Sequence, residues 1–129
     1  MDWTKPTTQM LGRFQPWHKG HTELFKQCLT KTGQVIIQIR WMPKNNDNPY
    51  DYKETTQNII NGLEKEGFKY GVEFEIERVP NIVDIGYGRD VGYTFTQYDL
   101  GEDIHRMSAT EIRNNENTGG RPLEKNTMT

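Results

Sequence analysis

The sequence is poor in cysteine, in long apolar runs and in net charge, and each scarcity excludes a class of protein. Its 129 residues include a single cysteine, Cys28, so an internal disulfide is impossible and a reducing compartment is expected. No apolar run approaches the ~20 residues that a membrane-spanning helix needs. The net charge of −2 provides no overall field that would favour nucleic acid as a partner.

The remaining composition is typical of a small, polar globular protein. The hydrophobic fraction is 33% and the mean hydropathy is −0.91, so we expect a lean core beneath a very polar surface. The first residues lack the charged-then-apolar order of a secretory signal peptide. We therefore predict a cytoplasmic protein with one domain over residues 1–113 and a polar, mobile tail over residues 114–129.

The first part of the chain predicts a strand–helix–strand unit. A strand is expected over residues 7–14, a helix over 21–30, and a nearly continuous β-branched strand, buried on both faces, over 35–39. Cys28 falls on the apolar face of that helix, where it is expected to be a small core residue. Gly33 follows as the helix stop, and the crossover between the strands should be right-handed.

A second helix and two further strands are expected downstream. The helix covers residues 51–65 and is followed by Gly67 as its stop. Val72, Phe74 and Ile76 alternate with glutamates, which predicts an edge strand with one solvated face. Residues 93–98 alternate aromatic and polar side chains and are predicted to form a fourth strand.

The most distinctive stretch, GRFQPWHKGH over residues 12–21, lies between the first strand and the first helix. The first turn of a helix exposes unpaired N–H groups and the positive end of the helix dipole, which attract anions. Gly12 and Gly20 carry no Cβ and therefore let the backbone approach a bulky ligand. His18 and His21 are three positions apart, close enough to converge on one ligand. A phosphate chain suits this junction best.

A second motif, SATEIR over residues 108–113, is expected to open a later helix. Ser108 and Glu111 can form a capping box, which is a sufficient structural explanation for those two residues. It does not explain why Arg113 lies one turn inside the helix with a second hydroxyl, Thr110, beside it. These two residues indicate a role for this motif beyond helix capping.

Together, the two motifs resemble the HxGH nucleotidyltransferase superfamily, in the form carried by nicotinamide mononucleotide adenylyltransferases. Gly-Arg-Phe-Gln-Pro-x-His-x-Gly-His is similar to the first signature of that group, and Ser-x-Thr-x-Ile-Arg is similar to the second. The resemblance implies a three-layer, Rossmann-like α/β fold. It would contain about five mostly parallel strands in the order 3-2-1-4-5, with helices on both faces.

The resemblance also implies a reaction without a protein nucleophile, in which a phosphate oxygen of the acceptor attacks the α-phosphorus of a nucleoside triphosphate. His18, His21 and Arg113 are the expected catalytic residues. The expected nucleotide- and phosphate-binding residues are Gly12, Arg13, Phe14, Lys19, Gly20, Ser108 and Thr110. Mg²⁺ would be carried on the triphosphate, since it needs few protein ligands and keeps waters, and no residue is assigned to it as a ligand. Relatives often assemble, so a homo-oligomer is compatible with the resemblance.

The choice of substrates depends on the residues that vary within the superfamily. Arg13 and Gln15 resemble the group that joins ATP to nicotinamide or nicotinate mononucleotide. Two alternatives stay open: cytidylyl transfer from CTP to a small phosphorylated alcohol, and a nucleotide-binding module without turnover.

Acceptor contacts are expected from two loops. Lys44 follows the second strand, and Asp84, Tyr87 and Arg89 lie in the irregular, glycine-rich stretch 81–92. Each group has a second interpretation. Lys44 would then be a solvated surface cation, and the stretch 81–92 a surface turn with an ion pair.

Overall fold

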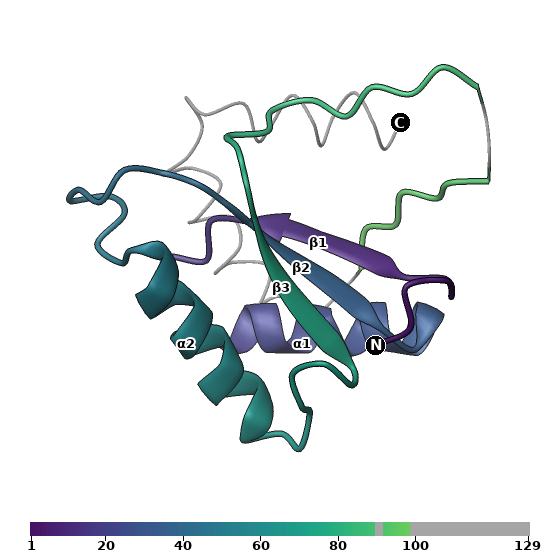
Figure 1. The fold of residues 1–129 in the computed structure, drawn as a ribbon, viewed down its shortest axis with the longest axis horizontal. Helices are drawn as coiled ribbons and strands as arrows, with labels where there is room; N and C mark the ends of the chain where they lie inside the picture. The colour runs from purple at the N-terminus through teal and green to yellow at the C-terminus, as the bar shows by residue number, and fades with distance from the viewer. Residues whose placement is uncertain (90–91, 99–129) are drawn as a thin grey trace. The chain divides into compact units, whose positions relative to one another are not determined.

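The first half of the chain forms a parallel sheet with two helices (Figure 1). The computed structural model describes residues 1–89 and 92–98, and the chain divides into two compact units, 1–81 and 82–129. The elements of the first unit are β1 (Thr8–Gly12), α1 (Lys19–Thr32), β2 (Val35–Arg40), α2 (Tyr52–Glu64) and β3 (Phe74–Val79). The predicted strand–helix–strand unit, second helix and third strand are thereby confirmed.

The strands are parallel and lie in the order β1-β2-β3, which is the 3-2-1 half of the predicted order. Gly12 is the partner of Ile39, and Ile39 is the partner of Arg78. Because the strands are parallel, their carboxyl ends meet at one edge of the sheet, here called the carboxyl edge. Residues 13–18 and 41–51, which carry most of the first motif and Lys44, leave the sheet at this edge.

Both helices cover the same face of the sheet. The Phe25 ring of α1 lies 5.8 Å from that of Phe74, and the Arg78 guanidinium of β3 lies 5.6 Å from the Tyr52 ring of α2. Phe74 and Arg78 point to one side of β3, because side chains alternate along a strand. Since β1, β2 and β3 follow one another in one direction across the sheet, two right-handed crossovers place both connecting helices on the same face. The buried strand residues on this face are Met10, Val35, Ile37, Ile39, Phe74 and Ile76.

The opposite face of the sheet is partly polar. Gln9 Nε2 donates to Gln38 Oε1, and Gln38 Nε2 donates to Glu77 Oε1 at 2.6 Å, so one polar chain crosses all three strands. The prediction that β2 is buried on both faces is wrong, because its residues alternate between buried and half-buried. The solvated side of β3 is confirmed, but Val72 lies in the preceding turn and is exposed.

The expected fourth strand does not form. Residues 92–98 are described and contain no strand. Alternating aromatic and polar residues favour a strand, but a strand exists only where a neighbour completes its hydrogen bonds, and the sequence pattern cannot supply that neighbour. The predicted fifth strand, the helix at Ser108 and the tail over 114–129 lie outside the described residues.

Residues with capping side chains or left-handed backbone conformations lie at the ends of the two helices. Gly33 ends α1 with φ 85°, and its N–H donates to the Leu29 carbonyl at 2.7 Å. Asp51 begins α2, because its carboxylate accepts from the Glu54 N–H at 2.8 Å, while Glu54 Oε1 accepts from the Asp51 N–H at 3.1 Å. Gly67, with φ 91°, follows the end of α2 as predicted.

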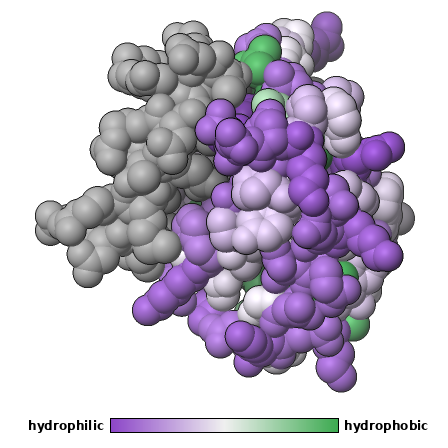
Figure 2. All heavy atoms as spheres, turned by 90° about the vertical axis from the view of Figure 1, so that its left-hand side faces the viewer, coloured by the Kyte–Doolittle hydropathy of each residue, from purple (hydrophilic) through white to green (hydrophobic). Residues whose placement is uncertain are grey.

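The surface agrees with the polar composition. The side of the first unit that carries α2 is mostly hydrophilic, with isolated hydrophobic residues (Figure 2). Within the described residues, none of the helices has the length and apolar character that crossing a membrane requires.

Cys28 should resist thiol reagents in the native protein. Its side chain is 3% exposed, and burial raises its pKa from 9.0 to about 11, so little thiolate is present near pH 8. We expect labelling by a chromogenic disulfide reagent at pH 8 to be at least about 10-fold slower without urea than in urea. The raised pKa also means that stability is lost as the pH rises from 9.0 through about 11. Equal labelling rates in the two conditions would contradict this burial.

Candidate functional site

The connection from β1 to α1 is a tight turn built around Phe14. Phe14 has φ 54°, a left-handed conformation that non-glycine residues seldom adopt. Its ring is buried and packs over Gly12, where an added Cβ would lie 3.0 Å from the ring. Packing therefore explains the glycine at position 12, because the Phe14 ring occupies the space that a side chain there would need.

The two histidines of the motif cap α1 reciprocally. His18 is the N-cap residue, and its Nδ1 accepts from the Gly20 N–H at 3.0 Å. His21 Nδ1 accepts from the His18 N–H at 3.1 Å, and the two rings stack with centroids 3.8 Å apart. Because both Nδ1 atoms act as acceptors, the proton of each neutral ring is assigned to Nε2. The fold thus brings together two stacked imidazoles that share the capping of one helix.

Aromatic packing holds His21 in place. Its side chain is buried, the Phe14 ring meets it edge-on at 5.0 Å, and the Trp17 ring lies 5.3 Å away. Trp17 is itself fixed, since its Nε1 donates to Thr22 Oγ1 at 2.8 Å. The indole also packs on Gly62 of α2, where a Cβ would approach it to 3.1 Å. The orientation of His21 therefore depends on both helices.

His18 borders an open groove of about 570 Å³ between this turn and α2. Its other lining residues include Trp17 and Lys19 on one side and Asn58 and Asn61 on the other. Lys19, the first residue of α1, is exposed, whereas Gly20 is buried against the helix start. A ligand in the groove would therefore meet an imidazole and an ammonium group together.

Arg13 lies at the carboxyl edge and is held by the loop that follows β2. The residue is buried, and its Nη1 donates to Asn48 Oδ1 at 2.9 Å. Asn48 is 1% exposed and is positioned by Asn45, whose Oδ1 accepts from the Asn48 N–H at 2.9 Å. Asn48 was not recognised from the sequence, because nothing in an asparagine-rich loop indicates which amide faces the sheet.

A second guanidinium lies at the same edge. Arg40 is the last residue of β2, directly after the partner of Gly12, and is half-buried. Burial lowers the pKa of Arg40, and the positive charge of Arg13 lowers it further. Arg40 was not among the predicted site residues, although a cation ending a buried parallel strand is a recognisable pattern.

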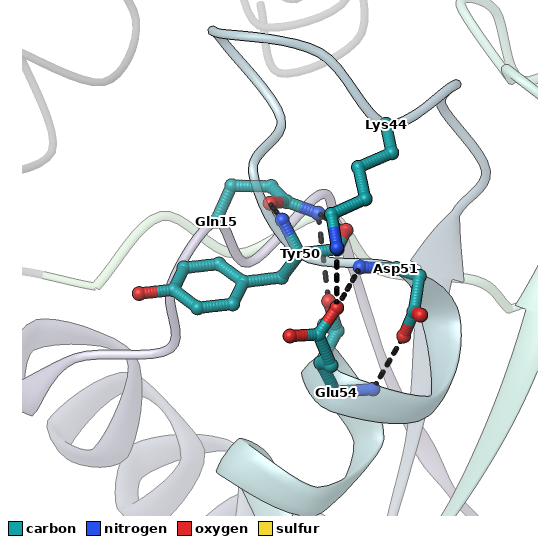
Figure 3. A network of polar contacts seen from close by, with 6 residues as sticks. Gln15, Lys44, Tyr50, Asp51 and Glu54 are labelled. Carbon is teal, nitrogen blue, oxygen red and sulfur yellow. Dashed lines mark hydrogen bonds and ion pairs between the residues drawn. The ribbon is translucent and has the colours of Figure 1, made fainter.

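Gln15 joins the first motif to the start of α2 (Figure 3). Its Nε2 donates to the Tyr50 carbonyl at 2.9 Å, and its Oε1 accepts from the Tyr50 N–H at 2.9 Å. Gln15, one of the two residues by which the motif resembles the mononucleotide adenylyltransferase group, thus binds backbone through its side-chain amide. Lys44, an expected acceptor contact, forms a surface ion pair with Glu54 at 3.1 Å.

The remaining predicted site residues lie outside the first unit. Asp84, Tyr87 and Arg89 belong to the second unit, where all three are exposed and the Tyr87 ring lies 5.9 Å from Phe95. Ser108, Thr110 and Arg113 lie outside the described residues. Their roles stay predictions.

Comparisons with known proteins agree with the motif resemblance. No family model matches the chain. Among curated proteins, the nicotinamide-nucleotide adenylyltransferase of Methanococcus aeolicus is 35% identical over 65 residues, which is 49% of this chain and 38% of the relative. That of Thermoplasma acidophilum is 39% identical over 59 residues, 44% of this chain and 33% of the relative.

A third relative, from Pyrococcus abyssi, carries the same name and is 34% identical over 61 residues, 46% of this chain and 33% of the relative. The chain therefore spans between 33% and 38% of the length of these three proteins. The similarity to nicotinamide-nucleotide adenylyltransferases predicted from the motifs is confirmed, and it extends over about half of the chain.

Replacing Gln15 by alanine should destabilise the protein, because the backbone N–H and carbonyl of Tyr50 would both lose their partner. Two neutral hydrogen bonds correspond to a loss of about 1–3 kcal/mol in the free energy of unfolding. The change can be measured by urea unfolding. Gln27→Ala is the matched control, since Gln27 is exposed on α1 and should change stability by less than about 0.5 kcal/mol. Equal stability of the two variants would contradict the assigned role of Gln15.

Proposed function

We propose that this chain transfers the nucleoside monophosphate of a nucleoside triphosphate, with ATP favoured, to a phosphorylated acceptor and releases pyrophosphate. The observation that carries the proposal is the stacked pair His18 and His21 at the start of α1, whose Nδ1 atoms cap the helix and whose ring protons are therefore assigned to Nε2. The favoured acceptor is nicotinamide or nicotinate mononucleotide. This choice is supported by relatives named nicotinamide-nucleotide adenylyltransferase.

The proposed reaction needs positioning and charge stabilisation from the protein. A phosphate oxygen of the acceptor forms a bond to the α-phosphorus, and the bond from that phosphorus to the oxygen bridging to the β-phosphate breaks. Negative charge builds on the α-phosphate oxygens and on the leaving pyrophosphate. The Nε2–H groups of His18 and His21 and the positive end of α1 would stabilise that charge. Lys19 and Arg13 would add cationic contacts to the phosphates.

The chemistry of the donor groups at the site also indicates how Mg²⁺ would be held. The groups assembled at the site are imidazole and backbone N–H, guanidinium and ammonium, which bind phosphate oxygens and do not ligate a hard cation. The residues therefore fit a Mg²⁺ that is held on the triphosphate, where it would neutralise phosphate charge. Ser108, Thr110 and Arg113 keep their proposed role on the β- and γ-phosphates.

A substrate panel tests the proposed function directly. Pyrophosphate release would be measured in the presence of Mg²⁺ with ATP or CTP, each paired with nicotinamide mononucleotide, nicotinate mononucleotide, glycerol 3-phosphate or phosphocholine. We expect release with ATP and a pyridine mononucleotide. Release only with CTP would contradict the proposed substrates but agree with the proposed mechanism. Nucleotide binding without release from any pair would overturn the enzymatic proposal in favour of a binding module.

His21→Asn separates chemistry from helix capping. The Asn side-chain oxygen can take over the acceptor role of His21 Nδ1, but Asn has no group at the position of Nε2. We expect turnover to fall by about 100-fold or more, while the melting temperature stays within about 5 °C of the wild type. His105→Asn is the matched control, because the third histidine lies outside both motifs. A His21→Asn variant with near-normal turnover would contradict the mechanism.

A further inference from the structure

The start of α1 carries a polar side-chain contact that the proposed function does not use. His18 is the N-cap residue, so Trp17 precedes the cap and Thr22 is the fourth residue of the helix. Apolar residues at these two positions often pack together as a hydrophobic staple, which fixes how the chain enters a helix. Here the contact is a hydrogen bond instead, because Trp17 Nε1 donates to Thr22 Oγ1 at 2.8 Å, and both side chains are buried.

The ring plane of His21 depends on the packing around it. Rotation of a histidine ring about its Cβ–Cγ bond has a broad energy profile, so local preference does not fix the plane. The hydrogen bond from the His18 N–H holds one ring atom, Nδ1. The Phe14 ring meets the imidazole edge-on, and the Trp17 ring lies at 35° to it with centroids 5.3 Å apart. A displaced indole would therefore let the imidazole turn.

The indole of Trp17 is held from a second direction by α2. A Cβ added at Gly62 would lie 3.1 Å from Trp17 Cδ1 and 3.2 Å from its Nε1. The edge of the indole that carries the N–H therefore lies directly against α2 at a position without a side chain. Because protein interiors are close-packed, a methyl group added there would have to displace the ring. Thr22 and Gly62 thus fix the same edge of the same ring.

We propose that Thr22 and Gly62 are positioning residues for nucleotidyl transfer, which hold the Trp17 indole and through it the plane of the His21 ring. The inference rests on the proposed function, in which His21 stabilises charge on the reacting phosphates. A small misplacement of a catalytic group can lower a rate by up to about 100-fold. Thr22 and Gly62 also line the groove beside His18, so direct contact with a substrate is the alternative that the test must separate.

Thr22→Val removes the hydrogen bond and keeps the helix start. Valine is β-branched like threonine and forms an apolar staple with Trp17, but it offers the indole N–H no acceptor. We expect kcat to fall by about 10-fold, with KM for ATP and for nicotinamide mononucleotide changed by less than about 3-fold. The melting temperature should stay within about 5 °C of the wild type.

Two further variants show whether the lost hydroxyl is the cause. Thr22→Ser keeps the acceptor and should restore kcat to within about 3-fold of the wild type. Thr30→Val is the matched control, since Thr30 is exposed on the same helix, and it should leave kcat unchanged. An equal loss in Thr22→Ser or in Thr30→Val would contradict a role for the hydrogen bond to Trp17.

Gly62→Ala tests the same inference from α2 and does not depend on the hydrogen bond. Alanine favours a helix more than glycine does, so the substitution should not lower the melting temperature by more than about 5 °C. The added methyl group should displace the indole and lower kcat by about 10-fold at nearly unchanged KM. Normal kcat in both Thr22→Val and Gly62→Ala would overturn the proposal. A rise in KM at normal kcat would also overturn it, because it would place these residues in contact with a substrate.

The histidine ring signals test the positioning role without turnover. The chain has three histidines, and the Cε1–H signal of His21 in a ¹H–¹³C spectrum is the one that His21→Asn lacks. We expect this signal to shift in Thr22→Val and in Gly62→Ala, because the ring is displaced relative to Trp17, and to stay in place in Thr30→Val. An unshifted signal in the first two variants would overturn the positioning role. A wild type that shows these shifts but no turnover would instead contradict the proposed function.

Discussion

The reciprocal capping of α1 by two imidazoles is the interaction on which the rest of the site depends. Helices are usually capped by Ser, Thr, Asp or Asn, whose acceptor oxygens serve only the helix start. Here the acceptors are ring nitrogens, His18 Nδ1 and His21 Nδ1. Each ring caps the helix through Nδ1, so its proton is assigned to Nε2. The contacts that cap the helix therefore also determine the tautomer assigned to each ring.

The packing around this cap explains why the neighbouring residues are large and apolar or very small. Phe14 and Trp17 surround the buried His21 ring, and each is accommodated by a glycine, Gly12 and Gly62 respectively. Gly62 belongs to α2, so the second helix supports a histidine of the first. Both helices lie on the same face of the sheet (Figure 1), and α2 can therefore contact the residues at the start of α1.

Neutral amides organise the cationic side of the site. Gln15 pairs with the backbone of Tyr50, Asn45 holds Asn48, and Asn48 accepts from Arg13. These amides thus tie the two segments that leave the carboxyl edge, 13–18 and 41–51, to each other.

Local sequence by itself determined the elements and the position of the first motif. The helix stops at Gly33 and Gly67, the capping box of Asp51 and Glu54, and the parallel strand of β-branched residues follow from conformational preferences and periodicity within a few residues. The convergence of His18 and His21 was equally readable, because residues three apart on a helix start must lie close together. Each of these features depends on neighbours in the chain.

Only the tertiary structure decided which polar residues meet. Arg40 joins Arg13 through strand register, and Asn48 reaches Arg13 across a loop, neither of which a linear pattern encodes. The contacts of Gln15 with Tyr50 and of Lys44 with Glu54 likewise cannot be read from a linear pattern. Tertiary structure also explains why the strand predicted from the alternation over residues 93–98 does not form, since a strand needs a partner that lies elsewhere in the chain.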